Sequence, residues 1–397
     1  MTNKNICFWL LFFSWFTNMA NQNVFSWLPG IPVQIPILIC LLFSLLKYDG
    51  HINKLSLYAL ASVILYLPSA LLSDYLLISG FKLINFAACL IGICLVFGDK
   101  EVILRSDSLI KVFRFITFIT MFIYLLKLGY TRNETGFSGV FSHPQVGGTF
   151  YALCFIYEVF WRRVNKSVKR YSTWISWVFI GLNIFFTLQS ESRTAFISAL
   201  LVMILFIVWS LTSSTFNLTY YHLITIACVF FISLFYIDTI LNYLDYVLSK
   251  SGRVEGGVIS SLESSRGALV ASSLQNFICN PIFGIGFQVS NGLFGSYPME
   301  INYWNGLPVG ASVEKGVFYS GLLEEVGLVG LLGFILFFFI YFIKYLNSYF
   351  ISTLIVLFAL FSNFGEATLF SFGGNGLFIW LIIIVISRTL NIRNNKV

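Results

Sequence analysis

Arg193 is the residue of this sequence best placed for charged chemistry, because it stands at the mouth of a strongly apolar run. It belongs to the stretch SESRTAFISALL, residues 190 to 201, in which Glu191 lies two positions before it. Its guanidinium could pair with Glu191 or with lipid headgroups, or it could clamp a phosphate with two hydrogen bonds, which arginine does better than lysine. Because an ionisable residue at membrane depth is costly and marks function by default, we expect the phosphate role.

Arg266 is a second candidate for binding an anion. It opens the helical stretch RGALVASS and precedes Gly284 of the glycine turn GIGF by eighteen positions. One arginine followed by a glycine turn is a weak motif, so an exposed residue in the first turn of a loop helix explains it equally well. Two other arginines are expected to be solvated or paired with glutamates: Arg132 with Glu134, and Arg253 with Glu255.

Four side chains are candidates for proton transfer. Glu314 precedes a predicted amphipathic helix and can face a loop cavity, where a partly desolvated carboxylate could take the proton of a sugar hydroxyl. His143 competes with it as the only histidine expected on the outer side of the membrane. Glu324 and Glu325 lie at a predicted membrane edge, where a salt bridge to an arginine and a catalytic role explain them equally well.

Three aromatic residues could stack on sugar rings, or they could form a belt at the membrane interface: Tyr297, Tyr303 and Trp304. The three histidines fall in different segments without metal-ligand spacing, so we expect neither a metal nor another cofactor. Six of the seven cysteines fall inside predicted spans and are expected to be packing residues.

The elements that position these residues must be membrane helices. The chain has 397 residues, of which 58% are hydrophobic and only 10% charged, a composition that no soluble domain of this size tolerates. A spanning helix needs about 20 mostly apolar residues. The first such run could be a signal peptide, but its single positive charge favours an uncleaved span. We predict about twelve transmembrane helices in one all-α domain, 1–397, at 5–18, 31–46, 55–72, 76–97, 113–128, 146–161, 174–189, 194–211, 221–240, 326–343, 349–364 and 373–388.

The distribution of charge predicts the topology, since short basic loops stay in the cytoplasm. With the N-terminus inside, sixteen of the 24 lysines and arginines face the cytoplasm, and twelve of the 17 carboxylates lie on or near the outer side. Both termini are then cytoplasmic. The net charge of +7 therefore reflects topology and does not indicate a nucleic-acid partner.

One connection is much longer than the others. Residues 241–325 are predicted to form a large outer loop between the ninth and tenth spans. Its last segment, SVEKGVFYSGLLEEVG, is predicted to lie as a helix on the membrane surface and to lead into the tenth span. A long ordered loop on a membrane scaffold usually carries function.

Several catalytic motifs do not occur in the sequence. It has no D-x-D pair for a metal and a nucleotide sugar, no G-x-x-x-x-G-K-[ST] phosphate loop and no G-x-S-x-G nucleophile elbow. A substrate on the outer side must then carry its own activating leaving group, as the sugar of a lipid diphosphate does.

Four segments together resemble a known superfamily. FSHPQVGG, SRTAFISALL, RGALVASSLQNFICNPIFGIGF and LLEEVGLVGLLGF, in this order, are similar to motifs of the O-antigen polymerases and O-antigen ligases of bacterial envelope glycan assembly. The resemblance covers roughly residues 130–345 by pattern and the rest by hydropathy.

The resemblance implies a metal-independent, inverting glycosyltransferase with a helical, GT-C-like fold in the bacterial inner membrane. Its active site would face the periplasm, and glycan linked to undecaprenyl diphosphate would be the donor. Two arginines of the superfamily hold the diphosphate, and by motif they correspond to Arg193 and Arg266. Lipid-linked oligosaccharide, membrane lipids and a chain-length regulator protein are the partners that it suggests.

One departure from the motifs favours the polymerase branch. Ligases usually carry a histidine just before the E-x-G-x-x-G helix, and this chain has SVEKGVFYSG there. Glu314 occupies about that position, so it could replace the histidine as base, with His143 as the competitor. A ligase that transfers glycan to lipid A core stays open as an alternative. A lipid-linked oligosaccharide flippase stays open too, although matching halves and a charged central pathway are not apparent.

Overall fold

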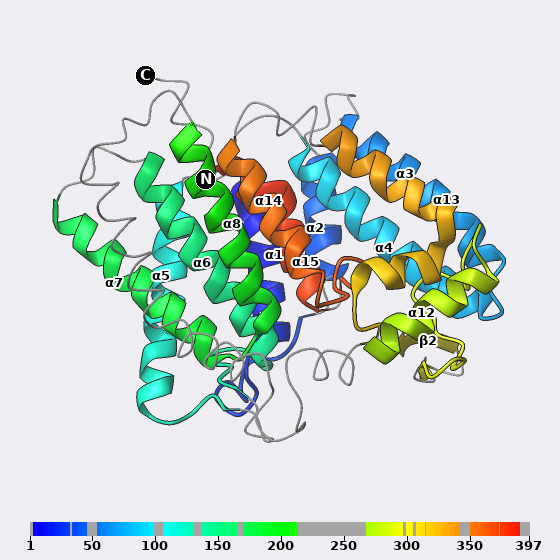
Figure 1. Ribbon diagram of the computed structural model, residues 1–397, viewed down its shortest axis with the longest axis horizontal. Helices are drawn as coiled ribbons and strands as arrows, with labels where there is room; N and C mark the ends of the chain where they lie inside the picture. Colours follow the sequence, from blue (N-terminus) through cyan, green and yellow to red (C-terminus); the bar gives the residue numbers. More distant parts are fainter. Residues whose placement is uncertain are drawn as a thin grey trace.

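The computed structural model describes residues 3–31, 34–45, 54–98, 106–130, 136–164, 170–212, 267–296, 299–304, 307–313, 315–341, 350–372 and 374–389. These residues are mostly helical, as the sequence predicts, and the helices pack side by side (Figure 1). The helices are α1 (Asn3–Met19), α2 (Gln34–Leu45), α3 (Lys54–Leu71), α4 (Leu76–Phe97), α5 (Ser106–Leu125), α6 (Pro144–Val164), α7 (Arg170–Gln189), α8 (Arg193–Thr212), α12 (Ala268–Cys279), α13 (Phe318–Tyr341), α14 (Phe350–Ser362), α15 (Asn375–Leu381) and α16 (Ser387–Thr389), with a π-helical segment at Ile382–Ile386 between the last two.

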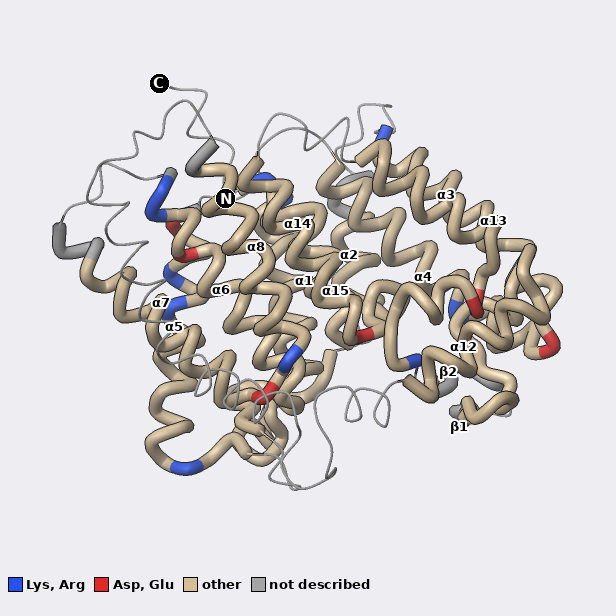
Figure 2. Tube along the Cα trace, viewed as in Figure 1, with Lys and Arg blue, Asp and Glu red and all other residues tan. Residues whose placement is uncertain are grey.

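Eleven of the twelve predicted spans coincide with described helices, and the ninth, 221–240, lies outside the described residues. α15, the π-helical segment and α16 follow one another without a gap over the last predicted span. By length and composition, five described helices could each cross a membrane: Lys54–Leu71, Leu76–Phe97, Asp107–Leu125, Arg193–Ser210 and Phe318–Tyr341. Figure 2 shows charged positions at only a few places along these helices. The fold is that of a helical membrane protein.

Aromatic side chains fill the interior of the bundle. Trp15 of α1 stacks on Phe378 of α15 with ring centroids 4.2 Å apart, and α1 therefore packs inside the fold. Phe86, Phe287 and Phe370 form a second aromatic group that joins α4 to two loops. Five of the predicted packing cysteines are confirmed as buried, namely Cys7, Cys40, Cys89, Cys94 and Cys154; Cys279 is exposed.

A buried ion pair ties three helices together elsewhere in the bundle. Arg114 of α5 pairs with Glu158 of α6 and donates a hydrogen bond of 2.8 Å to Ser176 of α7. Trp161 contributes a ring contact, with its centroid 5.1 Å from the arginine Cζ. Because each charge has a partner, this cluster fixes how the three helices pack.

A β-hairpin departs from the all-α prediction. β1 (Glu300–Trp304) pairs antiparallel with β2 (Leu307–Ser312), within the segment predicted as the large outer loop. The sequence carried a signal for it, since Asn-Gly at 305–306 separates two short runs that include β-branched and aromatic residues. The prediction treated this stretch only as an aromatic loop, because strands of five and six residues leave a weak periodic pattern.

α13 consists of two limbs that meet at Gly327, where φ is 59° and ψ is −162°. The second limb packs along α3 (Figure 1). The boundary that the sequence predicts between a surface helix and the tenth span, at residues 325–326, lies close to this break. This first limb is covered by protein, since Glu324 and Glu325 are 1% and 5% exposed. α12 and the loop that follows it cover this limb.

Candidate functional site

The break in α13 receives the loop NPIFGIGF, residues 280–287. Ile285 N donates to the Glu324 carbonyl at 2.9 Å, and Gly286 N donates to the Glu325 carbonyl at 3.1 Å. In the other direction, Leu328 N donates to the Pro281 carbonyl at 2.9 Å. A helix interruption leaves backbone groups without partners, and here the loop supplies them. Two of the four motif segments are therefore a single structural unit.

Two glycines make this contact possible. A Cβ on Gly284, whose φ is +69°, would lie 2.5 Å from the Glu324 carbonyl oxygen. A Cβ on Gly327 would lie 2.5 Å from the Ile282 carbonyl oxygen. Both positions combine a left-handed backbone with a close approach of main chains, and only glycine satisfies both demands.

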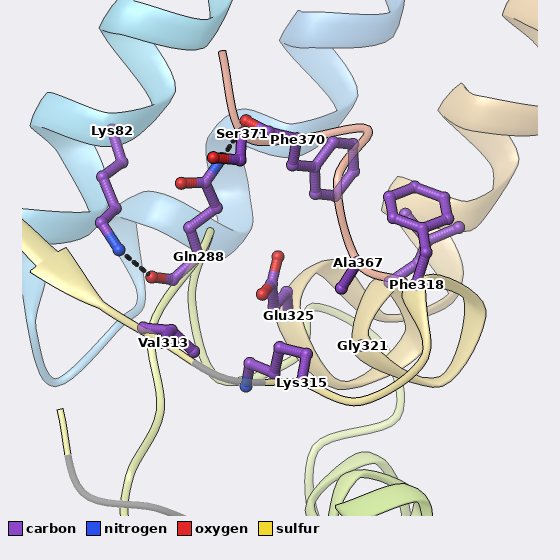
Figure 3. Close-up of a pocket in the computed structure, with 11 residues that line it drawn as sticks. Lys82, Gln288, Val313, Lys315, Phe318, Gly321, Glu325, Ala367, Phe370 and Ser371 are labelled. Atoms are coloured by element: carbon purple, nitrogen blue, oxygen red, sulfur yellow. Dashed lines mark hydrogen bonds between the residues drawn. The ribbon is translucent and has the colours of Figure 1, made fainter. Parts of the chain in front are cut away.

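A cavity of about 340 Å³ lies beside this unit (Figure 3). Its wall comes from α4, the loop after α12, the residues after β2, the first limb of α13 and the segment 367–371. The polar groups in the wall include Lys82, Gln288, Lys315, Glu325 and Ser371, and Phe318, Leu322 and Phe370 provide apolar surface. Figure 2 shows basic and acidic positions close together beside α4, α12 and α13. This volume and mixture of groups are typical of small-ligand sites.

Glu324 has a full set of partners. Its carboxylate accepts hydrogen bonds from Ser273 Oγ at 2.7 Å and from Asn276 Nδ2 at 2.8 Å, both on α12. Lys315 Nζ lies 2.8 Å from the same carboxylate, and both side chains are buried. The salt bridge expected for this glutamate therefore exists, but its partner is a lysine where the sequence suggested an arginine. The arrangement holds α12 onto α13.

Gln288 joins three elements at the edge of the cavity. Its φ is +53°, an uncommon value for a residue with a side chain. Lys82 Nζ donates to its carbonyl at 2.6 Å, and its side-chain amide donates to the Phe370 carbonyl (Figure 3). Its backbone N–H faces the carboxylate of Glu325. A strained residue whose polar groups all serve one site is typical of functional regions.

Arg193 lies at a second junction, where the other two motif segments meet. It is the first residue of α8, as the sequence predicts, and it is partly buried. Phe137 N donates to the Gln189 carbonyl at 2.8 Å, and a Cβ on Gly148 would overlap the side chain of Ser192. The segments FSHPQVGG and SRTAFISALL therefore pack against each other.

His143 lies at this same junction and is exposed. Its Nδ1 accepts a hydrogen bond from Gln145 N at 3.3 Å, at the point where α6 begins with Pro144. Proline fits the first position of a helix, where its missing N–H costs nothing, and the histidine caps the same turn.

The segment 363–371 connects the two junctions. A Cβ on Gly365 would overlap the side chain of Thr194, so the segment touches the first turn of α8. The Asn363 carbonyl accepts a hydrogen bond from Phe318 N at 3.2 Å, and residues 367, 370 and 371 line the cavity. The contacts described here join the end of α3, the starts of α4, α6, α8 and α13, and the end of α14. In the topology predicted from the charge distribution, all six helix ends would lie on the outer side.

The remaining predicted site residues are not brought together by the described part of the chain. Tyr303 lies on β1 and is 65% exposed, away from the cavity wall. Arg266, Tyr297 and Glu314, and the side chain of Trp304, lie outside the described residues, and with them the distance between the two proposed arginines.

Four polar residues of the cavity were missed by sequence reasoning, namely Lys82, Gln288, Lys315 and Ser371. Lys82 carried a usable signal, because it is the only charged residue within the predicted span 76–97. Comparison of the sequence with known protein families and with curated proteins finds no match.

Proposed function

We propose that this protein is a glycosyltransferase of the O-antigen polymerase type, which joins repeat units linked to undecaprenyl diphosphate at the periplasmic face of the bacterial inner membrane. The cytoplasmic position of both termini and the absence of a metal requirement belong to the same proposal. One observation carries it. The four segments that resemble the superfamily meet in two junctions, which the segment 363–371 connects beside a polar cavity.

The reaction is a single displacement at the anomeric carbon of the reducing-end sugar of the growing chain. A hydroxyl of the next lipid-linked repeat unit attacks, and undecaprenyl diphosphate leaves with inversion of configuration. Arg193 and Arg266 stabilise the charge that grows on the diphosphate, an interaction that strengthens as the bond breaks and so accelerates the reaction. The place of Arg193 at the start of a helix favours the same role, since helix N-termini attract anions.

The test uses the purified protein in detergent or liposomes with a defined lipid-linked repeat unit. Polymerase activity gives a ladder of joined units in a metal-free buffer. Protein that is folded and yet forms no product from any lipid-linked repeat unit would refute the proposal, and it would leave the flippase alternative standing.

A deletion strain separates the polymerase from the ligase. Loss of a polymerase leaves one repeat unit on the lipid A core, whereas loss of a ligase leaves none. The second pattern, together with transfer to lipid A core in vitro, would assign the protein to the ligase branch.

A further inference from the structure

We propose that Glu325 is the catalytic base of this reaction, and that the cavity lined by its carboxylate binds the sugar carrying the attacking hydroxyl. The inference rests on the proposed function, and it replaces Glu314 and His143 as the source of the base.

The first argument is the environment of the Glu325 carboxylate compared with that of its neighbour. Glu325 is 5% exposed and lines the cavity, and Figure 3 shows its carboxylate among the lining residues between Gln288 and Ala367. Within the described chain, no side chain donates a hydrogen bond to it, whereas Glu324 accepts two and contacts Lys315. The backbone N–H of Gln288 faces it. A carboxylate so placed keeps acceptor positions for a ligand.

The second argument is the balance of charge. Two ammonium groups, those of Lys82 and Lys315, accompany two carboxylates in this region. Lys315 contacts Glu324, and Lys82 holds the Gln288 carbonyl at 2.6 Å. The two ammonium groups therefore balance the negative charge of ionised Glu325. Among the described residues, however, neither forms an ion pair with its carboxylate at an N–O distance of 4 Å or less. A buried charge is tolerated when nearby groups of opposite charge balance it. The ionised carboxylate is the form that accepts a proton.

The third argument is the chemistry of the wall. Ser371 and Lys315 can donate hydrogen bonds, and Phe318, Leu322 and Phe370 present apolar surface. A sugar ring has a polar edge and a less polar face, and it suits a cavity of about 340 Å³ with this mixture. Because positive and negative groups balance, the cavity favours an uncharged polyhydroxylated ring over a diphosphate.

Proton transfer accompanies the displacement, in which one bond to the anomeric carbon forms and another breaks. As the hydroxyl oxygen of the bound sugar forms its bond to that carbon, its proton passes to the Glu325 carboxylate. The bond from carbon to the diphosphate oxygen breaks, and the leaving diphosphate keeps the electron pair. The proton is later released to water, which restores the ionised glutamate.

The competing base His143 is positioned less well for this role. It lies exposed at the Arg193 junction, and its Nδ1 accepts the hydrogen bond that starts α6. Glu325 is held in the break of α13 by hydrogen bonds to its carbonyl from Ser69 Oγ at 2.5 Å and from Gly286 N at 3.1 Å. A base whose backbone is fixed in this way loses little entropy when the reaction begins.

The main experiment compares E325Q and E325D with wild-type protein in the lipid-linked polymerisation assay. Glutamine keeps the shape and can still accept the Gln288 hydrogen bond, so E325Q should fold and bind the lipid-linked repeat unit. It should lose at least about 100-fold in turnover, since general base catalysis contributes roughly 10²- to 10⁴-fold. E325D keeps a carboxylate and should retain more activity than E325Q. E300Q makes the same change at an exposed position of β1 and should match wild type.

The outcomes separate the two proposals. If wild type forms no product, the proposed function fails. If wild type is active and folded E325Q is within a few-fold of it, the proposed function stands and Glu325 is not the base. Loss of binding with unchanged turnover at saturation would also overturn the catalytic role.

A second measurement does not depend on a variant that folds. A hydrophobic carbodiimide should modify Glu325 in the wild-type protein, and mass spectrometry can distinguish that site from Glu324. The lipid-linked repeat unit should protect Glu325 if its sugar occupies the cavity. Equal labelling with and without saturating repeat unit would refute the inference.

Discussion

Replacing Gly327 by alanine tests whether the contact between the α13 break and the loop NPIFGIGF holds this region together. The new Cβ would lie 2.5 Å from the Ile282 carbonyl oxygen, well inside ordinary van der Waals contact, and φ and ψ of 59° and −162° suit glycine alone. The clash falls on backbone that also accepts the hydrogen bond from Val329 N at 3.1 Å, so it cannot be relieved by a side-chain rotation.

The expected loss of stability follows from these terms. The backbone conformation costs about 1–3 kcal/mol for a residue with a side chain. Weakening the hydrogen bonds at Leu328 N and Val329 N adds about 1 kcal/mol each. A loss of about 3–5 kcal/mol lowers the Tm of a chain of this length by roughly 4–6 °C. Thermal unfolding of the purified protein in detergent measures this shift.

Gly295 provides the matched control for this substitution. Its φ is +83°, and nothing lies within 4 Å of an added Cβ, so G295A carries the backbone cost without the overlap. We expect the Tm of G295A to fall by less than half as much as that of G327A. If the two variants melt together, the close contact between the loop and α13 does not contribute, and the account of this junction is wrong.

Three further results are expected. R193A and R193K should each lower the rate of polymerisation by about 100-fold or more with unchanged expression, measured by gel analysis of the product ladder, and an unchanged ladder would exclude the arginine from diphosphate binding. K315M should destabilise the fold by about 3–5 kcal/mol, because it leaves the buried Glu324 without its cation. In thermal unfolding, the double variant K315M/E324Q should recover most of this loss, and no recovery would show that the ion pair is not its cause. G181A should raise stability by about 0.5–1 kcal/mol, since Gly181 lies inside α7 with open space around it, and a lower Tm would contradict this.

The helices were predictable because each apolar span carries its own signal, independent of what it packs against. The prediction 76–97 matches α4 at both ends, and Arg193 begins α8 where the sequence placed it. The hairpin was not predicted, because its strands have five and six residues and their aromatic content suggested a membrane interface. Short strands depend on their partner and leave little periodicity to detect.

The cavity was less predictable than the helices because main-chain groups build much of it. Gln288 enters the site through its carbonyl, which binds Lys82, and through a backbone N–H directed at Glu325. The positive φ of Gln288 accompanies this orientation, and the residue type at a position does not by itself predict a positive φ. Glu324 and Glu325 are adjacent and chemically identical, yet one is saturated by α12 and the other lines the cavity.

The two junctions show why the four motif segments occur together in one chain. At each junction a glycine allows a close approach: Gly284, in the loop after α12, lies against the backbone of Glu324 and Glu325, and Gly148, in α6, lies against the side chain of Ser192 just before α8. A substitution in one segment therefore displaces the other, although more than 35 positions separate them in the sequence. Because the segment 363–371 touches both the Thr194 side chain and the cavity, we expect a shift at either junction to affect the other. The proposed diphosphate-binding Arg193 and the proposed base would then keep a fixed separation, as a single displacement between them requires.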